Sequence, residues 1–168
     1  MRTALLALTL PIALLAAPAT AQDEKPAPKI AGDRSQDIAW HNLQQAHIAA
    51  LKPAEGWRYL PGGLKWRRIA GDGSGARPTV ADTVTVHYAG TFTDGTTFDS
   101  SFDRGEPATF PLAQLIKAWQ LAIPEMGVGD TIELAAPALL AYGTTGKGPI
   151  PGGATLLFKV QLLASAGR

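Results

Sequence analysis

Apolar side chains recur at every second position in several stretches of the chain, and this pattern predicts β-strands. The stretches are residues 64–69, 84–88, 132–136 and 156–162. A period of two is typical of a strand that buries one of its faces. Asp94 and Gly95 lie between two runs rich in Thr and Phe, which indicates a hairpin turn.

Apolar residues at i, i+3, i+4 and i+7 predict one short helix among these strands, formed by Leu112, Leu115, Ile116 and Trp119. It is expected to end before Pro124, since proline disfavours the helical conformation of the residue before it. Strands dominate the region, so we predict an α+β fold in which this helix covers the apolar face of an antiparallel sheet.

A second helix is predicted nearer the N-terminus, over residues 35–51, with Asp33 or Ser35 as its cap and Pro53 and Gly56 beyond its end. Its apolar face would carry Trp40, Leu43, His47 and Ala50. One amphipathic stripe is compatible with two interpretations: packing against the domain, which we favour, or contact with a second copy or a client protein.

The first 21 residues have the pattern of a secretory signal peptide. Arg2 gives a basic start, residues 4–17 are almost entirely apolar, and Ala19-Thr20-Ala21 forms a small-x-small cleavage site. The apolar run is short for a membrane span of about 20 residues, so cleavage near Ala21 is favoured over a retained anchor. The protein is therefore expected to be exported, to the periplasm or beyond. The polar, proline-containing residues 22–32 read as a linker.

Charge and composition exclude several classes of function. Removal of Arg2 with the signal peptide leaves 14 basic and 14 acidic residues, which gives no electrostatic footprint for nucleic acid. The chain has no cysteine, so disulfides and thiol chemistry are excluded. His41, His47 and His87 lack the spacing of metal ligands. No phosphate loop or nucleophile elbow is present, so neither a metal nor a cofactor is expected.

Aromatic residues are the remaining candidates for a site. They come from separate predicted elements: Tyr88, Phe98, Trp119, Tyr142 and Phe158. Tyr142 lies in a loop beside glycine, where aromatic side chains often contact ligands. Asp99 follows Phe98 directly. A concave apolar pocket with a few polar groups is a ligand site by default.

The motifs in this part of the chain resemble those of a known family. Residues 84–107 (VTVHYAGTFTDGTTFDSSFDRGEP) are similar to the signature of the FKBP-type peptidyl-prolyl cis-trans isomerases. Trp119, residues 126–130 (MGVGD), 140–143 (LAYG) and 150–158 (IPGGATLLF) continue the resemblance in order. It covers roughly residues 64–163, and residues 55–69 resemble the lead-in of secreted bacterial members.

The resemblance implies a curved antiparallel β-sheet wrapped around one short α-helix, with the short N-terminal helix outside the domain. The implied organisation is a signal peptide at 1–21, a linker and helix at 22–56, and the isomerase domain at 57–168. The implied activity is rotation of X-Pro bonds in exported proteins, without metal or cofactor. The implied partners are proline-containing unfolded polypeptides and, as inhibitors, macrolides of the rapamycin type.

The resemblance also implies a role for each matching residue. Trp119 would form the pocket floor, and the walls would be Tyr88, Phe98, Ile116 and Phe158. Leu115 and Ile150 would line the rim. Asp99 would lie beside the reacting amide, held by Arg104 and Tyr142, and the Tyr142 hydroxyl would donate to a substrate carbonyl. Asp99, Tyr142, Trp119 and Phe98 are thus the implied catalytic residues.

Two departures concern ligand preference. Ala108 stands where the family often has an aromatic residue, so one wall is expected to be lower, and Lys147 stands where many members have histidine. Two other functions stay open: a binding module or chaperone that holds proline-containing segments without turnover, and a hydrolase using Asp99 and His87. The hydrolase is disfavoured because His87, next to Tyr88 in a strand, points to the opposite face.

Overall fold

The computed structural model describes residue 34 and residues 36–167. The predicted signal peptide, the linker at 22–32 and the predicted caps Asp33 and Ser35 lie outside the described residues. Within them, no helix is long and apolar enough to cross a membrane.

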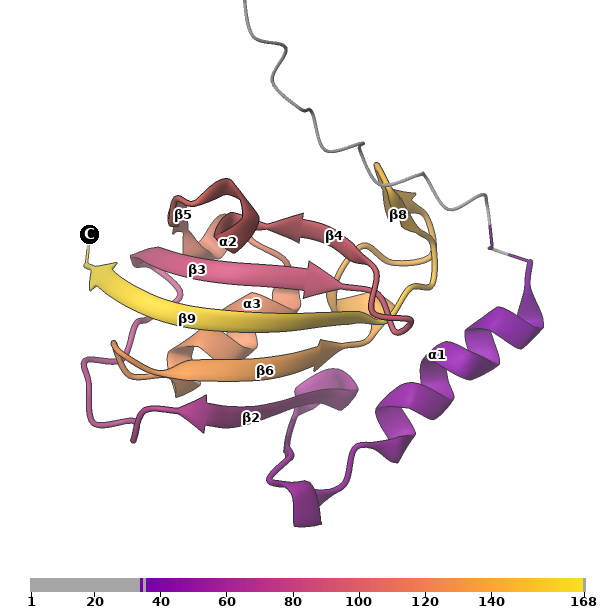
Figure 1. The fold of residues 1–168 in the computed structure, drawn as a ribbon, viewed down its shortest axis with the longest axis horizontal. Coiled ribbons are helices and arrows are strands. Elements are labelled where there is room, and N and C mark those ends of the chain that lie inside the picture. Colours follow the sequence, from indigo (N-terminus) through magenta and orange to yellow (C-terminus); the bar gives the residue numbers. More distant parts are fainter. Residues whose placement is uncertain (1–33, 35, 168) are drawn as a thin grey trace, which may run out of the picture.

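One curved antiparallel sheet organises the described part of the chain (Figure 1). Its strand order is β1-β2-β6-β9-β3-β4, and β5 pairs with the first half of β3, along the same edge of β3 as β4. The strands are β1 (Arg58–Leu60), β2 (Leu64–Ala70), β3 (Thr83–Thr91), β4 (Thr97–Ser100), β5 (Ala108–Pro111), β6 (Thr131–Ala136) and β9 (Leu156–Ala166). A separate ribbon pairs β7 (Gly146–Lys147) with β8 (Ile150–Pro151). The four predicted strand stretches are confirmed, as is the hairpin between β3 and β4.

The alternation of side chains along the central strands builds the core. In β3, Val84, Val86 and Tyr88 are buried, while Thr85 and His87 between them are only partly covered. The register opposes Val86 to Leu162 and Tyr88 to Val160 in β9. These buried side chains face α3 (Lys117–Ala122), which lies behind the sheet in Figure 1. The predicted arrangement of a helix covering one apolar sheet face is therefore confirmed.

The segment predicted as one helix over 112–119 is broken in two, so that prediction was wrong in its extent. A 3₁₀ turn covers Leu112–Gln114, and α3 begins only at Lys117. Leu115 and Ile116 between them are extended, with ψ of 172° and 150°. The Gln120 side chain donates to the Leu115 carbonyl oxygen at 2.8 Å, which satisfies a group that a continuous helix would have bonded itself.

The N-terminal helix α1 (Ile38–Ala50) begins at Asp37, whose carboxylate accepts a hydrogen bond from the Trp40 backbone N–H at 2.9 Å. Its packed face differs from the predicted one. Leu43 and Ala50 are exposed, whereas Gln44 and Ile48 are buried. A polar residue occupies the centre of this face because its amide group finds partners in the β3–β4 turn and in the residue before β9.

Three sets of contacts fix α1 to the rest of the protein. The Gln44 side chain accepts from the Thr155 backbone N–H at 3.1 Å and donates to the Thr93 hydroxyl at 3.1 Å. The buried Lys65 ammonium donates to the carbonyl oxygens of Ile48 at 2.6 Å and Leu51 at 2.7 Å, and so caps the helix C-terminus. Ile48 also packs with Trp57 and Ala135 in a second apolar cluster. The favoured interpretation of this helix, packing against the domain, is confirmed.

Candidate functional site

An apolar pocket of about 200 Å³ opens between the concave face of the sheet and α3. We call it the aromatic pocket, and its lining residues are Tyr88, Phe98, Asp99, Phe110, Leu115, Ile116, Trp119, Tyr142 and Phe158. The structure thus brings together eight of the ten residues selected from the sequence. These residues come from segments that are far apart in the chain, from β3 to β9, so the pocket exists only in the folded protein.

The other two selected residues lie beside the pocket. Ile150 lines an outer cavity together with Lys147, Gly148, Pro149 and the outer sides of Phe98, Asp99 and Tyr142. Arg104 belongs to neither lining and instead contacts Asp99. This contact agrees with its expected role of holding the Asp99 carboxylate, and its place among the substrate-binding residues stays a prediction.

Four aromatic rings form the floor and walls of the pocket through edge-to-face contacts. The Trp119 ring centre lies 5.3 Å from that of Tyr88 and 5.5 Å from that of Phe158, with planes at 81° and 83°. Phe98 meets Phe158 at 5.8 Å and 89°. Such arrangements are favourable for the ring quadrupoles. Because each ring is held by two or more elements, the pocket is preformed.

Gly90 allows two of these rings to approach the strand. A Cβ atom at this position would lie 2.5 Å from Phe98 Cζ and 3.1 Å from Phe158 Cε1. Any side chain here would push the wall rings apart. The Tyr-x-Gly spacing in residues 88–90 is thus required by ring packing on the pocket side of β3.

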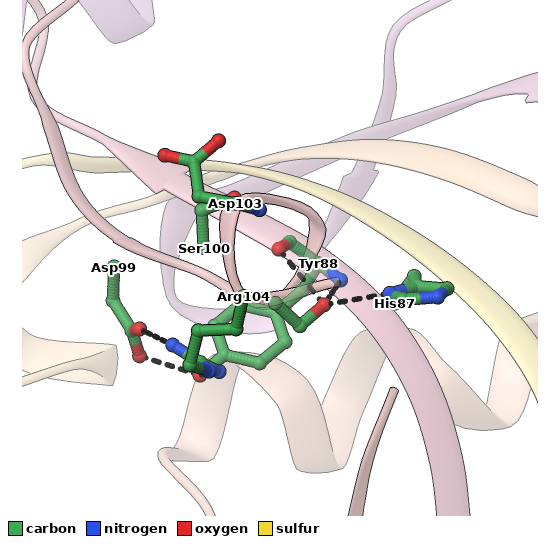
Figure 2. Close-up of polar contacts among 7 residues, drawn as sticks. His87, Tyr88, Asp99, Ser100, Asp103 and Arg104 are labelled. Carbon is green, nitrogen blue, oxygen red and sulfur yellow. Dashed lines mark hydrogen bonds and ion pairs between the residues drawn. The ribbon is translucent and has the colours of Figure 1, made fainter. Parts of the chain in front are cut away.

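Asp99 is held by Tyr88 and Arg104. The Tyr88 hydroxyl donates to Asp99 Oδ2 at 2.5 Å, Arg104 Nη1 donates to Oδ1 at 2.5 Å, and Arg104 Nη2 donates to the Tyr88 oxygen at 3.1 Å (Figure 2). The expectation that Tyr142 holds this carboxylate is therefore wrong. Tyr88 takes that place because β3 and β4 are neighbouring strands, with Gly90 opposite Asp99.

The sequence between Asp99 and Arg104 explains their pairing. Asp99 lies near the end of β4, and the short helix α2 (Ser101–Arg104) follows at once. Ser100 caps α2 by accepting from the Asp103 backbone N–H at 3.1 Å. The single turn returns Arg104 toward the carboxylate. With side chains 44% and 50% exposed, this ion pair contributes less than about 1 kcal/mol to stability, so its main effect is orientation.

Burial and the Asp99 carboxylate govern the ionisation of the two tyrosines. Burial raises the pKa of Tyr88, and its hydrogen bond to Asp99 raises the pKa further. Burial also raises the pKa of Tyr142, with a smaller contribution from the negative charge of Asp99. Hydrogen bonds to Tyr88 and Asp99 raise the pKa of Arg104. Both hydroxyls therefore keep their protons at neutral pH and can act as donors.

Tyr142 differs from Tyr88 in having a hydroxyl available to a ligand. No hydrogen bond joins this hydroxyl to another group in the described part of the chain, and the ring lines both the aromatic pocket and the outer cavity. Lys147 Nζ lies 6.0 Å from the centre of the ring. The Trp119 indole N–H is likewise buried without a partner among the described residues. These two donors, Asp99 and the Tyr88 hydroxyl bonded to it are the polar side-chain groups of an otherwise apolar pocket.

His87 lies on the opposite face of the sheet. Its ring stacks on Phe102 at 4.8 Å and its Nδ1 lies 3.0 Å from the Ser101 hydroxyl oxygen. The same Ser101 oxygen accepts from the Tyr88 backbone N–H at 2.7 Å. His87 is thus a hydrogen-bonded strand histidine, as expected, and the arrangement gives no support to a hydrolase that pairs it with Asp99.

Two residues of the site were missed from the sequence. Phe110 lines the pocket and meets Tyr88 at 6.3 Å, so the wall expected to be low at Ala108 is supplied two positions later on β5. The period of two in a strand was the available signal, since residues 108 and 110 share a face. Ser101, fully buried, holds the backbone of Tyr88 from the adjacent α2. Nothing in the sequence alone separates it from an ordinary cap residue.

Metal chemistry has no candidate centre in the described residues, where no group of three or more His, Cys, Asp or Glu side chains converges.

Comparison with known proteins agrees with this geometry. Residues 75–163 match the family model of the FKBP-type peptidyl-prolyl cis-trans isomerases. The chain belongs to this family. It is 48% identical over 120 residues to the FKBP-type peptidyl-prolyl cis-trans isomerase FkpA of Aeromonas hydrophila, covering 71% of this chain and 44% of that protein. It is 45% identical over 120 residues to the outer membrane protein MIP of Legionella longbeachae, covering 71% and 51%.

The fold of this FKBP-type protein is likewise similar to a solved structure. The crystal structure of FkpA from Escherichia coli matches with a TM-score of 0.68 and 35% identity, over 77% of this chain and 59% of that one. The chain thus spans about half the length of the curated relatives described above.

Proposed function

We propose that this protein is a peptidyl-prolyl cis-trans isomerase that accelerates rotation about X-Pro bonds in exported polypeptides. The observation that carries the proposal is the preformed aromatic pocket, with Asp99 and the Tyr142 hydroxyl on its border, in a chain of the FKBP-type family. A prolyl ring fits a pocket of this size and character, because rigid aromatic rings supply apolar contact at little entropic cost.

Isomerisation needs no nucleophile. Rotation about an amide costs about 18–20 kcal/mol because resonance must be lost. The twisted amide is less polar along its C–N axis than the planar one, so transfer from water to an apolar pocket favours the twisted form. Catalysis then follows from tighter binding of the transition state. A millionfold acceleration corresponds to about 8 kcal/mol, and burial of one ring with a few hydrogen bonds is of that order.

Each residue has a role in this proposal. Trp119 forms the floor beneath the prolyl ring, and Tyr88, Phe98, Ile116 and Phe158 form the walls. Asp99, oriented by Tyr88 and Arg104, lies beside the twisting amide. Tyr142 donates to a carbonyl oxygen that flanks the proline, and Leu115 and Ile150 receive the substrate backbone at the rim. The same pocket is proposed to accept macrolides of the rapamycin type, with Phe110 closing the wall beside Ala108 and Lys147 altering the rim.

The decisive experiment is a protease-coupled isomerisation assay on a short X-Pro peptide. We expect the protein to accelerate the cis-to-trans step catalytically, in proportion to enzyme concentration. Binding of the peptide without acceleration would instead identify a non-catalytic module that holds proline-containing segments.

Tyr142→Phe isolates the proposed donor, since it removes the hydroxyl and keeps the ring. Loss of one neutral hydrogen bond is worth about 0.5–1.5 kcal/mol, so we expect kcat/KM to fall about two- to twelvefold. The melting temperature should hardly change, because the hydroxyl has no partner in the described residues. An unchanged kcat/KM beside an active wild type would remove Tyr142 from the catalytic residues and leave a purely apolar pocket.

The isomerisation rate should be nearly flat between about pH 6 and 8, where histidine titrates. No histidine lines the pocket, and the pKa values of Tyr88 and Tyr142 are raised above the ordinary tyrosine value. The hydroxyl donors therefore stay protonated throughout this range. A bell-shaped profile of kcat/KM centred near pH 6.5 would contradict a mechanism without proton transfer.

We propose further that the mature protein acts outside the cytoplasm, after cleavage near Ala21. The support is the basic start, the apolar run and the Ala19-Thr20-Ala21 site in residues 1–21. N-terminal sequencing of the protein from its native host should begin at Gln22. Recovery of the full-length chain from the cytoplasm would exclude this location.

A further inference from the structure

A second concave surface lies between α1 and the turn that joins β3 to β4. We call it the α1 groove. Its volume is about 400 Å³, larger than the aromatic pocket, and its walls include Trp40, Leu43 and His47 from the helix and Phe92 and Asp94 from the turn. Figure 1 shows the helix running beside this turn, at the same end of the sheet as β8.

The α1 groove adjoins the proposed substrate site on two sides. The Phe92 ring contacts Phe98, a wall of the aromatic pocket, with ring centres 5.0 Å apart. Pro151 lines the groove and directly follows Ile150, which lines the outer cavity. A polypeptide that leaves the aromatic pocket past Ile150 therefore meets the groove next.

Apolar groups inside the groove are open to solvent. Leu43 is 65% exposed on α1, and the half-buried Trp40 and Phe92 flank the same space. Arg34 and Asp94 contribute opposite charges, so the lining has no net preference for a charged ligand. This combination suits an apolar side chain of the ligand, with its backbone left in water.

Hydrogen bonds hold the walls of the groove together. Gln44, only 3% exposed, lies at the base of the groove, where its amide bonds Thr93 on one wall and Thr155 behind it. The helix cannot move away from the β3–β4 turn without breaking these bonds. A preformed groove loses little entropy on binding, which favours affinity.

We propose that the α1 groove binds an apolar side chain of the same polypeptide whose proline occupies the aromatic pocket. The proposal rests on the proposed function and deepens it, because it assigns a substrate class: unfolded chains that carry an apolar residue at a set distance from proline. Ring contacts of 5.5, 5.8 and 5.0 Å lead from Trp119 through Phe158 and Phe98 to Phe92. The direct separation is at most the total of these steps, which an extended chain covers in about five residues, at about 3.3 Å each.

The test compares peptides of two lengths. One is a four-residue X-Pro peptide. The longer peptides have thirteen residues and one proline each. In two of them a leucine lies five positions before or five positions after the proline. Two matched peptides carry serine in place of that leucine. We expect kcat/KM for one of the two leucine peptides to be about three- to tenfold higher than for its serine counterpart. The gain should come from a lower KM, because the groove buries the leucine side chain.

Leu43→Glu should abolish this preference for leucine and leave the rate on the four-residue peptide unchanged. The matched control is Ile38→Glu, on the same helix and 74% exposed but outside the lining of the groove. It adds the same charge and should change neither the preference for leucine nor the rate on the four-residue peptide. Equal behaviour of the two variants on the leucine peptides, or no leucine preference in the wild type, would overturn the proposal.

Two further outcomes separate the groove proposal from the proposed isomerase activity and from self-association. Failure of the wild type on the four-residue peptide would contradict isomerase activity. The groove proposal would then be tested by comparing the dissociation constants of the leucine and serine peptides. Equal dissociation constants would overturn that proposal too. A change of particle mass in light scattering for Leu43→Glu, but not for Ile38→Glu, would show that a second copy of the chain occupies the groove instead.

Discussion

Replacement of Trp119 by alanine is expected to have the largest combined effect on stability and activity. The side chain is 4% exposed and contacts two other rings of the pocket. Truncating such a residue costs about 3–5 kcal/mol in the free energy of unfolding. It also removes the floor against which the prolyl ring packs, so kcat/KM should fall at least about tenfold, equivalent to about 1.36 kcal/mol of transition-state binding. Urea unfolding and the peptide assay measure the two effects.

Trp57→Ala is the matched control for this prediction. Trp57 is 6% exposed, but it packs with Ile48 and Ala135 in the second apolar cluster and does not line the aromatic pocket. It should lose comparable stability and keep its kcat/KM on a four-residue peptide at temperatures where it is folded. Equal loss of activity in both variants would mean that stability alone explains the Trp119 effect. If Trp119→Ala fails to fold, Trp119→Phe retains a ring and permits the same comparison.

Removal of α1, in a chain that starts at Lys52, should lower the free energy of unfolding by about 2–5 kcal/mol. The estimate is the burial of Ile48, at about 1.5–3 kcal/mol for a fully buried side chain, together with the smaller contribution of the partly buried Leu51. The loss would take a large part of the about 5–15 kcal/mol that stabilises an ordinary domain. The truncation also leaves the Thr155 backbone N–H without its Gln44 acceptor, next to strand β9. Thermal and urea unfolding would both report the change.

A chain that starts at Gln36 is the control for this truncation, because it retains the helix and its Asp37 cap. It should unfold at the same urea concentration as the longer chain. Equal stability of the two truncated chains would show that α1 rests on the surface without stabilising the domain. If the shorter chain does not fold, Ile48→Ala offers a milder measure of the same contact, with an expected cost of about 2–5 kcal/mol.

The strands were predictable from the sequence because each buries one face, and burial of one face forces alternation of apolar and polar residues. Most of the pocket was also predictable, since Asp99 and Phe98 lie in one contiguous motif and Trp119, Tyr142 and Phe158 follow in a recognisable order. What could not be predicted depends on contacts between distant segments. Gln44 has no apolar signal, yet it is buried because Thr93 and Thr155 satisfy its amide.

Lys65 illustrates the same limit. Alternation within 64–69 leaves this lysine on the polar face, which suggests exposure to water. The structure buries it instead, because two carbonyl oxygens at the C-terminal end of α1 accept hydrogen bonds from the ammonium there. The partner of Asp99 was misjudged for a related reason. The strand pairing, and not the spacing along the sequence, decided that the hydroxyl beside the carboxylate belongs to Tyr88.

The place of β9 in the sheet has a consequence for the order in which the chain can fold. This strand is the last in the described sequence, yet it lies between β6 and β3 and pairs with both. The first helix also bonds to Thr155, 111 residues after Gln44. Neither the sheet nor its contact with α1 can therefore close until Thr155 and β9 have been synthesised. Contacts of such long range slow folding, so the native sheet forms only after this late strand is available.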